Sequence, residues 1–240
     1  DLDVSLRRLF TARFQLGMFD PADQVPFSKL SLTEVESKTH VAKSLEMARK
    51  SIVLLKNNNI LPLSKDLKRI AVVGPNANDA EMLWANYNGT PNHTETILSG
   101  LIDKMPNAEI IYEKGCGLTS SDKIEVNTEA TVNHVKDADV IIFVGGISPR
   151  LEGEEMPVKI DGFSGGDRTS IDLPAVQEEM LKALKATGKP VIMILCTGSA
   201  IALNWENDNL DAIVNAWYGG QEAGTAVADV LFGDYNPAGR

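Results

Sequence analysis

The chain contains, near its middle, the segment Ala138-Asp139-Val140-Ile141-Ile142-Phe143-Val144-Gly145-Gly146. Its first seven residues are mostly apolar and rich in β-branched side chains, which predicts one strand buried on both faces. The two glycines release the chain into a long loop, and Leu173-Pro174 marks the expected start of a helix. A buried strand, a loop and a helix in this order form the repeating unit of α/β folds.

Similar apolar runs occur on both sides of this segment, at 69–74, 109–112, 191–195 and 212–216. Helical patterns separate most of them, at about 93–105, 126–136, 174–187 and 221–232. Helices that alternate with short, continuously apolar strands predict a mainly parallel sheet with helices on both faces, a three-layer α/β/α sandwich. Residues 51–57 predict an additional edge strand or extended segment.

The N-terminal region has a different pattern. Residues 2–18 predict an amphipathic helix whose apolar side chains recur at steps of three and four, and we expect ordinary core packing for its face, formed by Leu2, Leu6, Leu9, Phe10 and Phe14. Residues 21–36 are polar and contain proline, which favours a linker or a strap over a surface. A second helix is expected at about 37–50, with Val41, Leu45 and Ala48 facing inward.

The composition excludes several classes of protein. The net charge of −10 argues against nucleic acid or an anionic membrane as a partner, because both require a basic face. No apolar run approaches the roughly 20 residues that span a bilayer. The two cysteines, Cys116 and Cys196, and the three scattered histidines show no metal-ligand spacing and no disulfide framework. We therefore expect neither a metal nor a cofactor.

Both ends of the chain look cut, because a helical pattern begins at the first residue and the turn at 236–239 should lead into another strand. We therefore expect a fragment of a longer protein.

The loop at 145–173 is the candidate acid/base site. In open α/β sheets ligands bind at the carboxyl ends of the strands, and this loop follows such an end. It is rich in glycine, which lets a backbone approach a ligand closely, and it carries the carboxylates Glu152, Glu154, Glu155, Asp161 and Asp167. The alternative is an acidic loop that is simply solvated. We expect Asp167 and Arg168 to anchor the loop through a structural ion pair.

The loop at 74–92 does not resemble a nucleotide site, since it lacks G-x-G-x-x-G and Pro75 removes a donor amide. It carries Trp84, Asn86, Tyr87 and Asn88, a mixture of aromatic faces and amides that suits sugar rings, although simple loop packing would explain the aromatic residues too. For Asn204-Trp205 and Trp217-Tyr218, at two other strand ends, packing against the edge of the sheet is the favoured interpretation.

Several segments together resemble glycoside hydrolase family 3, the family of β-glucosidases, β-xylosidases and related exo-acting enzymes. The matching segments are Lys50-Ser51-Ile52-Val53-Leu54-Leu55-Lys56-Asn57, Ile70-Ala71-Val72-Val73-Gly74-Pro75-Asn76-Ala77, Gly166-Asp167-Arg168, Leu173-Pro174-x-x-Gln177, Trp217-Tyr218-Gly219-Gly220-Gln221-Glu222-Ala223-Gly224 and Gly233-Asp234-Tyr235-Asn236-Pro237-Ala238-Gly239-Arg240. The resemblance implies that residues 51–240 form the α/β domain that follows a (β/α)₈ barrel. Residues 1–20 would be the last barrel helix, and 21–50 the linker and a helix.

The resemblance also implies a retaining mechanism with two carboxyl groups about 5–5.5 Å apart. An aspartate of the barrel, which matches nothing in this chain, would be the nucleophile. A glutamate of this domain would be the acid/base, and the resemblance maps it to Glu152. Glu154 is the alternative, because this sequence has about a dozen more residues between Glu154 and Asp167 than the family pattern, and the alignment can shift by two residues.

The expected partners are an oligosaccharide or aryl-glycoside substrate, with Trp84 and Tyr87 as candidate sugar contacts, and the missing barrel. The resemblance suggests a periplasmic or secreted location. The competing hypothesis is a non-catalytic carbohydrate-binding or interaction module.

Overall fold

The computed structural model describes residues 1–120, 122 and 127–239. The chain divides into two compact units, Asp1–His40 and Val41–Arg240, and each is described by itself. Among the described helices, none is long and apolar enough to cross a membrane. The start of the helix expected at 126–136 and most of 121–125 in the preceding loop fall outside the described residues.

The first unit contains α1 (Leu2–Gln15) and three short 3₁₀ turns, η1 (Ala22–Gln24), η2 (Pro26–Lys29) and η3 (Leu32–Glu34). The helix is shorter than predicted because Gly17 adopts a left-handed φ of 70° and the amide of Met18 bonds back to the carbonyl of Arg13. After this turn Phe19 stacks on Phe10, with ring centroids 5.8 Å apart.

The apolar face of α1 is exposed, so the expected core packing is wrong for the described chain. Leu2 is 81% exposed and Phe14 63%, and none of the residues of the helix is buried. Leucine and phenylalanine at helical spacing show that one face of a helix is apolar. They do not show whether the surface that packs against this face belongs to the same chain segment.

The second unit is built on a six-stranded sheet with the order β1-β9-β8-β4-β2-β3. Its strands are β1 (Val53–Asn57), β2 (Arg69–Val73), β3 (Glu109–Glu113), β4 (Val140–Gly146), β8 (Val191–Cys196) and β9 (Ala212–Asn215). All pairings are parallel except that of the edge strand β1, which runs antiparallel to β9. The mainly parallel sheet and the edge strand at 51–57 are confirmed.

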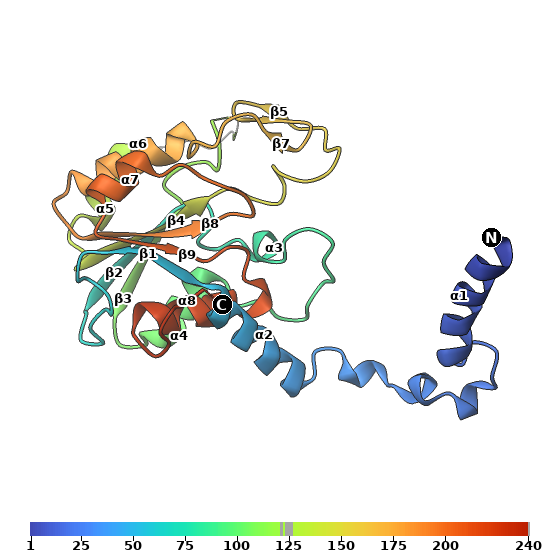
Figure 1. Cartoon of the computed structure of the whole chain (residues 1–240). Helices are drawn as coiled ribbons and strands as arrows, with labels where there is room; N and C mark the ends of the chain where they lie inside the picture. Colours follow the sequence, from blue (N-terminus) through green and yellow to red (C-terminus); the bar gives the residue numbers. More distant parts are fainter. Residues whose placement is uncertain (121, 123–126, 240) are drawn as a thin grey trace. The chain divides into compact units, whose positions relative to one another are not determined.

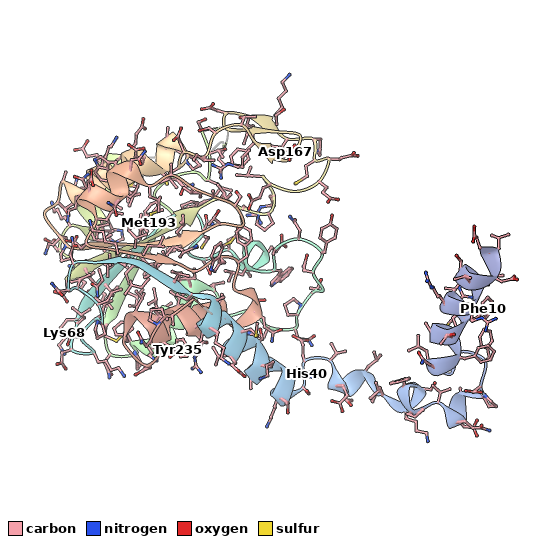
Figure 2. All side chains as sticks on the ribbon, viewed as in Figure 1. Phe10, His40, Lys68, Asp167, Met193 and Tyr235 are labelled. Atoms are coloured by element: carbon pink, nitrogen blue, oxygen red, sulfur yellow. The ribbon has the colours of Figure 1, made fainter. Side chains whose placement is uncertain are left out.

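Helices cover both faces of this sheet (Figure 1). One core packs the sheet against α2 (Lys38–Ser51), α3 (Ala80–Leu83), α4 (Ile97–Lys104) and α8 (Ala223–Leu231). The other packs it against α5 (Thr128–Val135) and α6 (Ala175–Lys185), with Trp205 of α7 (Asn204–Asn209) partly buried beside them. Successive side chains of a strand point to opposite faces of the sheet. Ile142 therefore packs in the first core and Phe143 in the second, where the fully buried Met193 (Figure 2) also lies. Continuous apolarity in the sequence therefore reflects burial on two faces.

Two glycines let the chain pass very close to the backbone of the adjacent strand as it leaves the sheet. Gly74 and Gly146, after β2 and at the end of β4, have φ values of 128° and 127°. A Cβ on Gly74 would lie 2.1 Å from the carbonyl oxygen of Val144, and one on Gly146 would lie 2.1 Å from that of Cys196. Only glycine fits either position, so each strand-end loop crosses directly over the end of the next strand.

Gln177 of α6 fixes the end of β4. Its side chain is fully buried, its Oε1 accepts a hydrogen bond from the amide of Gly146 (2.8 Å), and its Nε2 donates to the carbonyls of Gly146 and Leu118 (both 2.7 Å). One amide side chain thus satisfies both backbone groups of the residue from which the acidic loop departs.

That loop has a structure that the sequence did not predict. It contains a small antiparallel sheet of three two-residue strands, β5 (Lys159–Ile160), β6 (Phe163–Ser164) and β7 (Asp167–Arg168). Strands this short carry no readable alternation, which explains why the segment was expected to be irregular.

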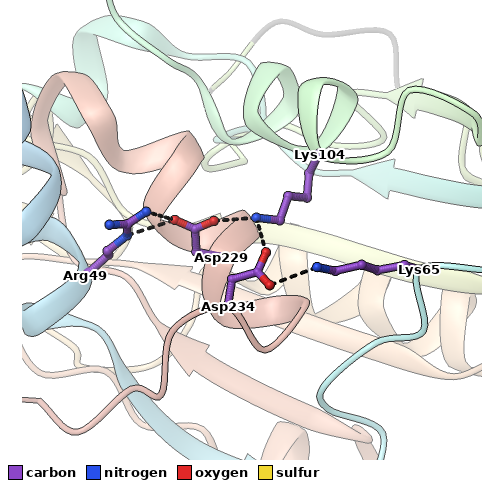
Figure 3. A network of polar contacts seen from close by, with 5 residues as sticks. All are labelled: Arg49, Lys65, Lys104, Asp229 and Asp234. Carbon is purple, nitrogen blue, oxygen red and sulfur yellow. Dashed lines mark hydrogen bonds and ion pairs between the residues drawn. The ribbon is translucent and has the colours of Figure 1, made fainter.

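A chain of charged groups joins the helices on one side of the sandwich (Figure 3). Asp229 of α8 is 4% exposed and accepts hydrogen bonds from Arg49 of α2 and Lys104 of α4. Lys104 also pairs with Asp234, which binds Lys65 in turn. Because both carboxylate oxygens of Asp229 have cationic partners, the buried charge is compensated.

We expect Asp229→Ala to lower the free energy of unfolding by about 3 kcal/mol, because it leaves Arg49 and Lys104 without their shared buried partner. Urea denaturation followed by circular dichroism measures the change. Glu46→Ala is the matched control, since Glu46 is an exposed carboxylate between Lys43 and Lys50, and it should have no measurable effect. Equal losses in the two variants would show that Asp229 acts as an ordinary surface charge.

Candidate functional site

Three loops at the carboxyl edge of the sheet meet at the carboxylate of Glu152. Its Oε1 accepts hydrogen bonds from the amide of Gly198 (2.9 Å) and the hydroxyl of Tyr218 (2.8 Å). Its Oε2 accepts a hydrogen bond from the hydroxyl of Ser199 (2.6 Å). Glu152 follows β4, Gly198 and Ser199 follow β8, and Tyr218 follows β9, so one side chain joins the ends of three adjacent strands.

The backbone at Trp217 aims Tyr218 at this carboxylate. Trp217 has a left-handed φ of 56°, which is uncommon for a bulky residue. It is held there by hydrogen bonds from its amide to Asn215 Oδ1 (3.2 Å) and from its indole nitrogen to the carbonyl of Ser51 (2.9 Å). Burial raises the pKa of Tyr218, and the charge of Glu152 raises it further. The phenol therefore stays protonated, and its hydroxyl donates a hydrogen bond to Glu152.

Arg168 binds the acidic loop to the loop after β8. It donates to the carbonyls of Ser170 (2.9 Å), Asp172 (3.1 Å) and Ala200 (3.3 Å), and its guanidinium lies 5.0 Å from the ring centroid of Phe163. Burial lowers its pKa, and the nearby charge of Glu152 opposes that shift. The expected ion pair with Asp167 is absent from the contacts of the described residues, so Arg168 anchors the loop through carbonyl groups instead.

Glu154 lies two residues further on and is far less constrained. Its Oε2 accepts a hydrogen bond from the hydroxyl of Tyr87 (3.1 Å), and both side chains are exposed, Tyr87 by 90%. This hydrogen bond and the charge of Glu154 raise the pKa of Tyr87. The loop after β2 therefore contacts the acidic loop. Tyr87, a candidate sugar contact, lies beside Glu154, the alternative acid/base residue.

Trp84 lies in the same β2 loop and is half-buried. Its indole nitrogen donates to Thr94 Oγ1 (2.8 Å), and its side chain lines a hollow of about 440 Å³ together with Asn86 and Met156. The amide nitrogen of Asn86 donates to the carbonyl of Glu152 (3.0 Å). Trp84, Tyr87, Glu152 and Glu154 thus lie on two loops that contact each other.

The other candidate carboxylates of the loop are not part of this arrangement. Glu155, Asp161 and Asp167 are exposed and, in the described structure, form no ion pair. Arg150, at the start of the loop, pairs with Asp79. Among the described residues, neither Glu152 nor Glu154 forms an ion pair.

Gly198, Ser199 and Tyr218 are the residues that sequence reasoning missed. Packing against the sheet edge was the interpretation favoured for Trp217-Tyr218, and Gly198 and Ser199 were not singled out. A usable signal was present, because both loops follow strands near β4 and parallel strands bring their carboxyl ends to one edge. A strand order is needed to turn that signal into a contact.

Hydrogen bonds hold the carboxyl group of Glu152 in one orientation. A carboxylate has about four lone-pair positions, and three of those on Glu152 are occupied, which fixes its orientation and leaves one for a substrate or water. Within the described ranges, no group of three or more His, Cys, Asp or Glu side chains could hold a metal ion. A carboxyl group held in this way, with two hydroxyl groups beside it, is chemically able to give or take a proton.

A family model for the glycosyl hydrolase family 3 C-terminal domain matches residues 52–240. The chain therefore belongs to glycoside hydrolase family 3, and it is a C-terminal α/β domain of the β-xylosidase and β-glucosidase type.

Individual relatives agree with this placement. A xylan 1,4-β-xylosidase of Xylanibacter ruminicola is 36% identical, with all of this chain and 44% of that protein aligned. A periplasmic β-glucosidase of Salmonella typhimurium is 34% identical, with all of this chain and 33% of that protein covered. The structure of a family 3 exo-β-xylosidase in complex with a xylobiose aziridine activity-based probe matches 97% of this chain and 29% of its own, with a TM-score of 0.84 and 35% identity. The chain thus spans less than half the length of these proteins.

We expect Tyr218→Phe to destabilise the domain by about 1 kcal/mol, because it removes a partly buried hydrogen bond to the carboxyl group of Glu152. Thermal unfolding measures the loss. Tyr87→Phe removes the corresponding hydroxyl from the exposed Glu154 and should leave the melting temperature unchanged. A Tyr218→Phe protein as stable as the parent would mean that the contact with Glu152 is not formed in solution.

Proposed function

We propose that this domain supplies the acid/base glutamate of a retaining, exo-acting β-xylosidase or β-glucosidase, and that this residue is Glu152. The observation that carries the proposal is the convergence of Gly198, Ser199 and Tyr218 on one carboxylate. A catalytic acid must be held within a fraction of an ångström of its productive position, and three contacts from two neighbouring loops provide such a constraint.

The partners of Glu152 suit a group that changes protonation state twice in each turnover. In the first step the carboxylic acid gives its proton to the departing glycosidic oxygen while a carboxylate nucleophile bonds to the anomeric carbon. In the second step the carboxylate takes a proton from water, which then displaces the nucleophile. Hydroxyl groups can donate or accept, so Ser199 and Tyr218 can stay bonded to either form by rotating. A lysine or arginine partner would oppose the protonated form.

Glu154 is the alternative acid/base, and its position supports a different role. It is exposed, and among the described residues its carboxylate accepts one hydrogen bond, from an exposed tyrosine, so the carboxyl group has no fixed orientation. We propose that Glu154 and Tyr87 form part of the surface that meets the leaving group. Trp84 lines the neighbouring hollow and offers an aromatic face to a sugar ring.

The nucleophile is proposed to lie in a barrel domain outside this chain. We propose that residues 1–20 are the last helix of that barrel, 21–50 a linker and helix, and 51–240 the α/β domain. The exposed apolar face of α1 supports this division, because such a face needs a partner to cover it. The substrate class is an oligosaccharide or aryl-glycoside.

In the complete enzyme, we expect Glu152→Gln to lower kcat on substrates with poor leaving groups by about 100- to 10,000-fold, the usual contribution of general acid–base catalysis. Azide should partly restore turnover of activated aryl-glycosides by replacing the water that needs a general base. Steady-state kinetics with and without azide measures both effects.

Glu154→Gln is the control in the same assay, and it should change kcat much less and show no azide rescue. The reverse pattern, with rescue only in Glu154→Gln, would move the acid/base assignment by two residues. Full activity in both variants would favour the competing interpretation, a non-catalytic carbohydrate-binding or interaction module.

We also expect the 240-residue chain alone to release no product from aryl-xylosides or aryl-glucosides, because it would hold only one of the two catalytic carboxyl groups. Release of nitrophenol followed by absorbance provides the test, with the complete enzyme as the positive control. Turnover by the chain alone at the rate of the complete enzyme would contradict the proposed division of the site.

A further inference from the structure

Arg168, besides anchoring the acidic loop, contacts one of the hydrogen-bond partners of Glu152. Its Nη1 lies 3.4 Å from the hydroxyl oxygen of Ser199, and the same hydroxyl donates to Glu152 Oε2 over 2.6 Å. Arg168 and Glu152 both belong to the acidic loop, whereas Ser199 follows β8. The Ser199 hydroxyl therefore lies between a guanidinium and a carboxylate that come from two parts of the same loop.

This chain of polar contacts has one favoured direction. A guanidinium has only N–H donors and no acceptor, and a serine hydroxyl has a single proton to donate. If the proton of Ser199 pointed at Arg168, it would oppose the N–H groups there. Arg168 therefore favours the arrangement in which Ser199 presents a lone pair to the guanidinium and its proton to Glu152. Donation to a carboxyl group stabilises its ionised form.

The backbone around Ser199 holds its hydroxyl in this place. The amide of Ser199 donates to Thr197 Oγ1 (3.1 Å), and the hydroxyl of Thr197 donates to the carbonyl of Ser199 (2.5 Å). On the other side, Arg168 donates to the carbonyls of Ala200 (3.3 Å) and Asp172 (3.1 Å). Both members of the contact between Arg168 and Ser199 are thus fixed by bonds to the backbone.

The charge of Arg168 acts on Glu152 from behind this hydroxyl group. Within the described residues the two side chains form no ion pair, yet Arg168 interacts electrostatically with Glu152 more strongly than with Tyr218 or Asp172. Tyr218 faces the carboxylate from the loop after β9, and the acidic residues at 154–155 on its own loop are exposed. A direct ion pair would hold Glu152 ionised. A cation behind a hydroxyl group favours the ionised form less strongly and leaves protonation possible.

We propose that Arg168 is a positioning residue that acts through Ser199: it keeps the Ser199 hydroxyl directed at Glu152 Oε2 and so favours the ionised carboxylate. The consequence for the reaction rests on the proposed function of Glu152. In that mechanism the ionised form is the base of the second step, and a cation at one remove supports it without blocking the protonated form that the first step needs.

Titration of the Glu152 carboxyl group in the 240-residue chain tests this role without catalysis. NMR of a chain with isotope-labelled glutamate carboxyl carbons follows these groups through pH, and Glu152→Gln identifies the signal of Glu152. Arg168→Gln removes the charge but can still donate hydrogen bonds. Because loss of a nearby cation disfavours the ionised form, we expect the midpoint to move to higher pH by about half a pH unit or more.

Three further variants separate the effect of the charge from effects on the fold. Arg168→Lys keeps the charge and should keep the midpoint close to that of the parent. Lys159→Gln removes an exposed cation from the same small sheet and should not move the midpoint. Ser199→Ala removes the intermediate hydroxyl group and should itself raise the midpoint. Arg168→Gln added to Ser199→Ala should then have a smaller effect than in the parent chain, because coupled residues are not additive.

An unchanged midpoint in Arg168→Gln would overturn the proposal. Equal shifts in Arg168→Lys and Arg168→Gln would also overturn it, because the charge would then play no part. So would an effect of Arg168→Gln that is as large without the Ser199 hydroxyl as with it. If Arg168→Gln does not fold, as judged by circular dichroism, Ser199→Ala decides, and an unchanged midpoint in that variant overturns the proposal.

In the complete enzyme the same change should appear in the pH profile. The proposed acid must be protonated in the free enzyme, so the basic limb of kcat/KM on a substrate with a poor leaving group should move to higher pH in Arg168→Gln, in step with the NMR midpoint. An NMR shift without a moved limb would support the positioning role and count against the catalytic role of Glu152. The two hypotheses can therefore fail separately.

Discussion

The proposed site depends on the hydrogen bonds that hold the carboxylate of Glu152. It receives one hydrogen bond from an amide and two from hydroxyl groups, and the donors belong to loops that follow β8 and β9. This shared acceptor connects the acidic loop to the loops after β8 and β9. With it, a long acidic segment containing three very short strands is held against the sheet at a residue that can perform acid/base chemistry.

The sheet makes this convergence possible because its parallel strands end at the same edge. Gly146 adopts a backbone conformation reserved for glycine, which lets the acidic loop begin directly over the end of β8. Gln177 then satisfies both backbone groups of the same glycine. The loop therefore starts from a rigid point, and its direction is set before Arg168 fixes its far end through backbone carbonyls.

The fold could be predicted largely from the sequence, since buried strands such as 140–144 and 191–195 are continuously apolar and helical patterns separate most of the strands. The site could be predicted only in part. Glu152 was chosen through a resemblance, and its partners were missed because a contact between Tyr218 and residue 152 depends on strand order, which local patterns do not encode. The exposed face of α1 was misjudged for a related reason: apolar periodicity shows that a face needs covering and does not identify the covering surface.

The domain thus combines a rigid sheet edge with one well-positioned glutamate, and in the proposed mechanism the nucleophile belongs to a part of the protein outside this chain. The most direct test of this account is a crystal structure of the complete enzyme with a glycosyl residue trapped on its nucleophile. The account predicts that the Glu152 carboxyl group still bonds to Tyr218 and Ser199 and lies within hydrogen-bond distance of the water that faces the anomeric carbon. A structure with Glu154 in that position, or with Glu152 pointing away from the trapped sugar, would contradict it.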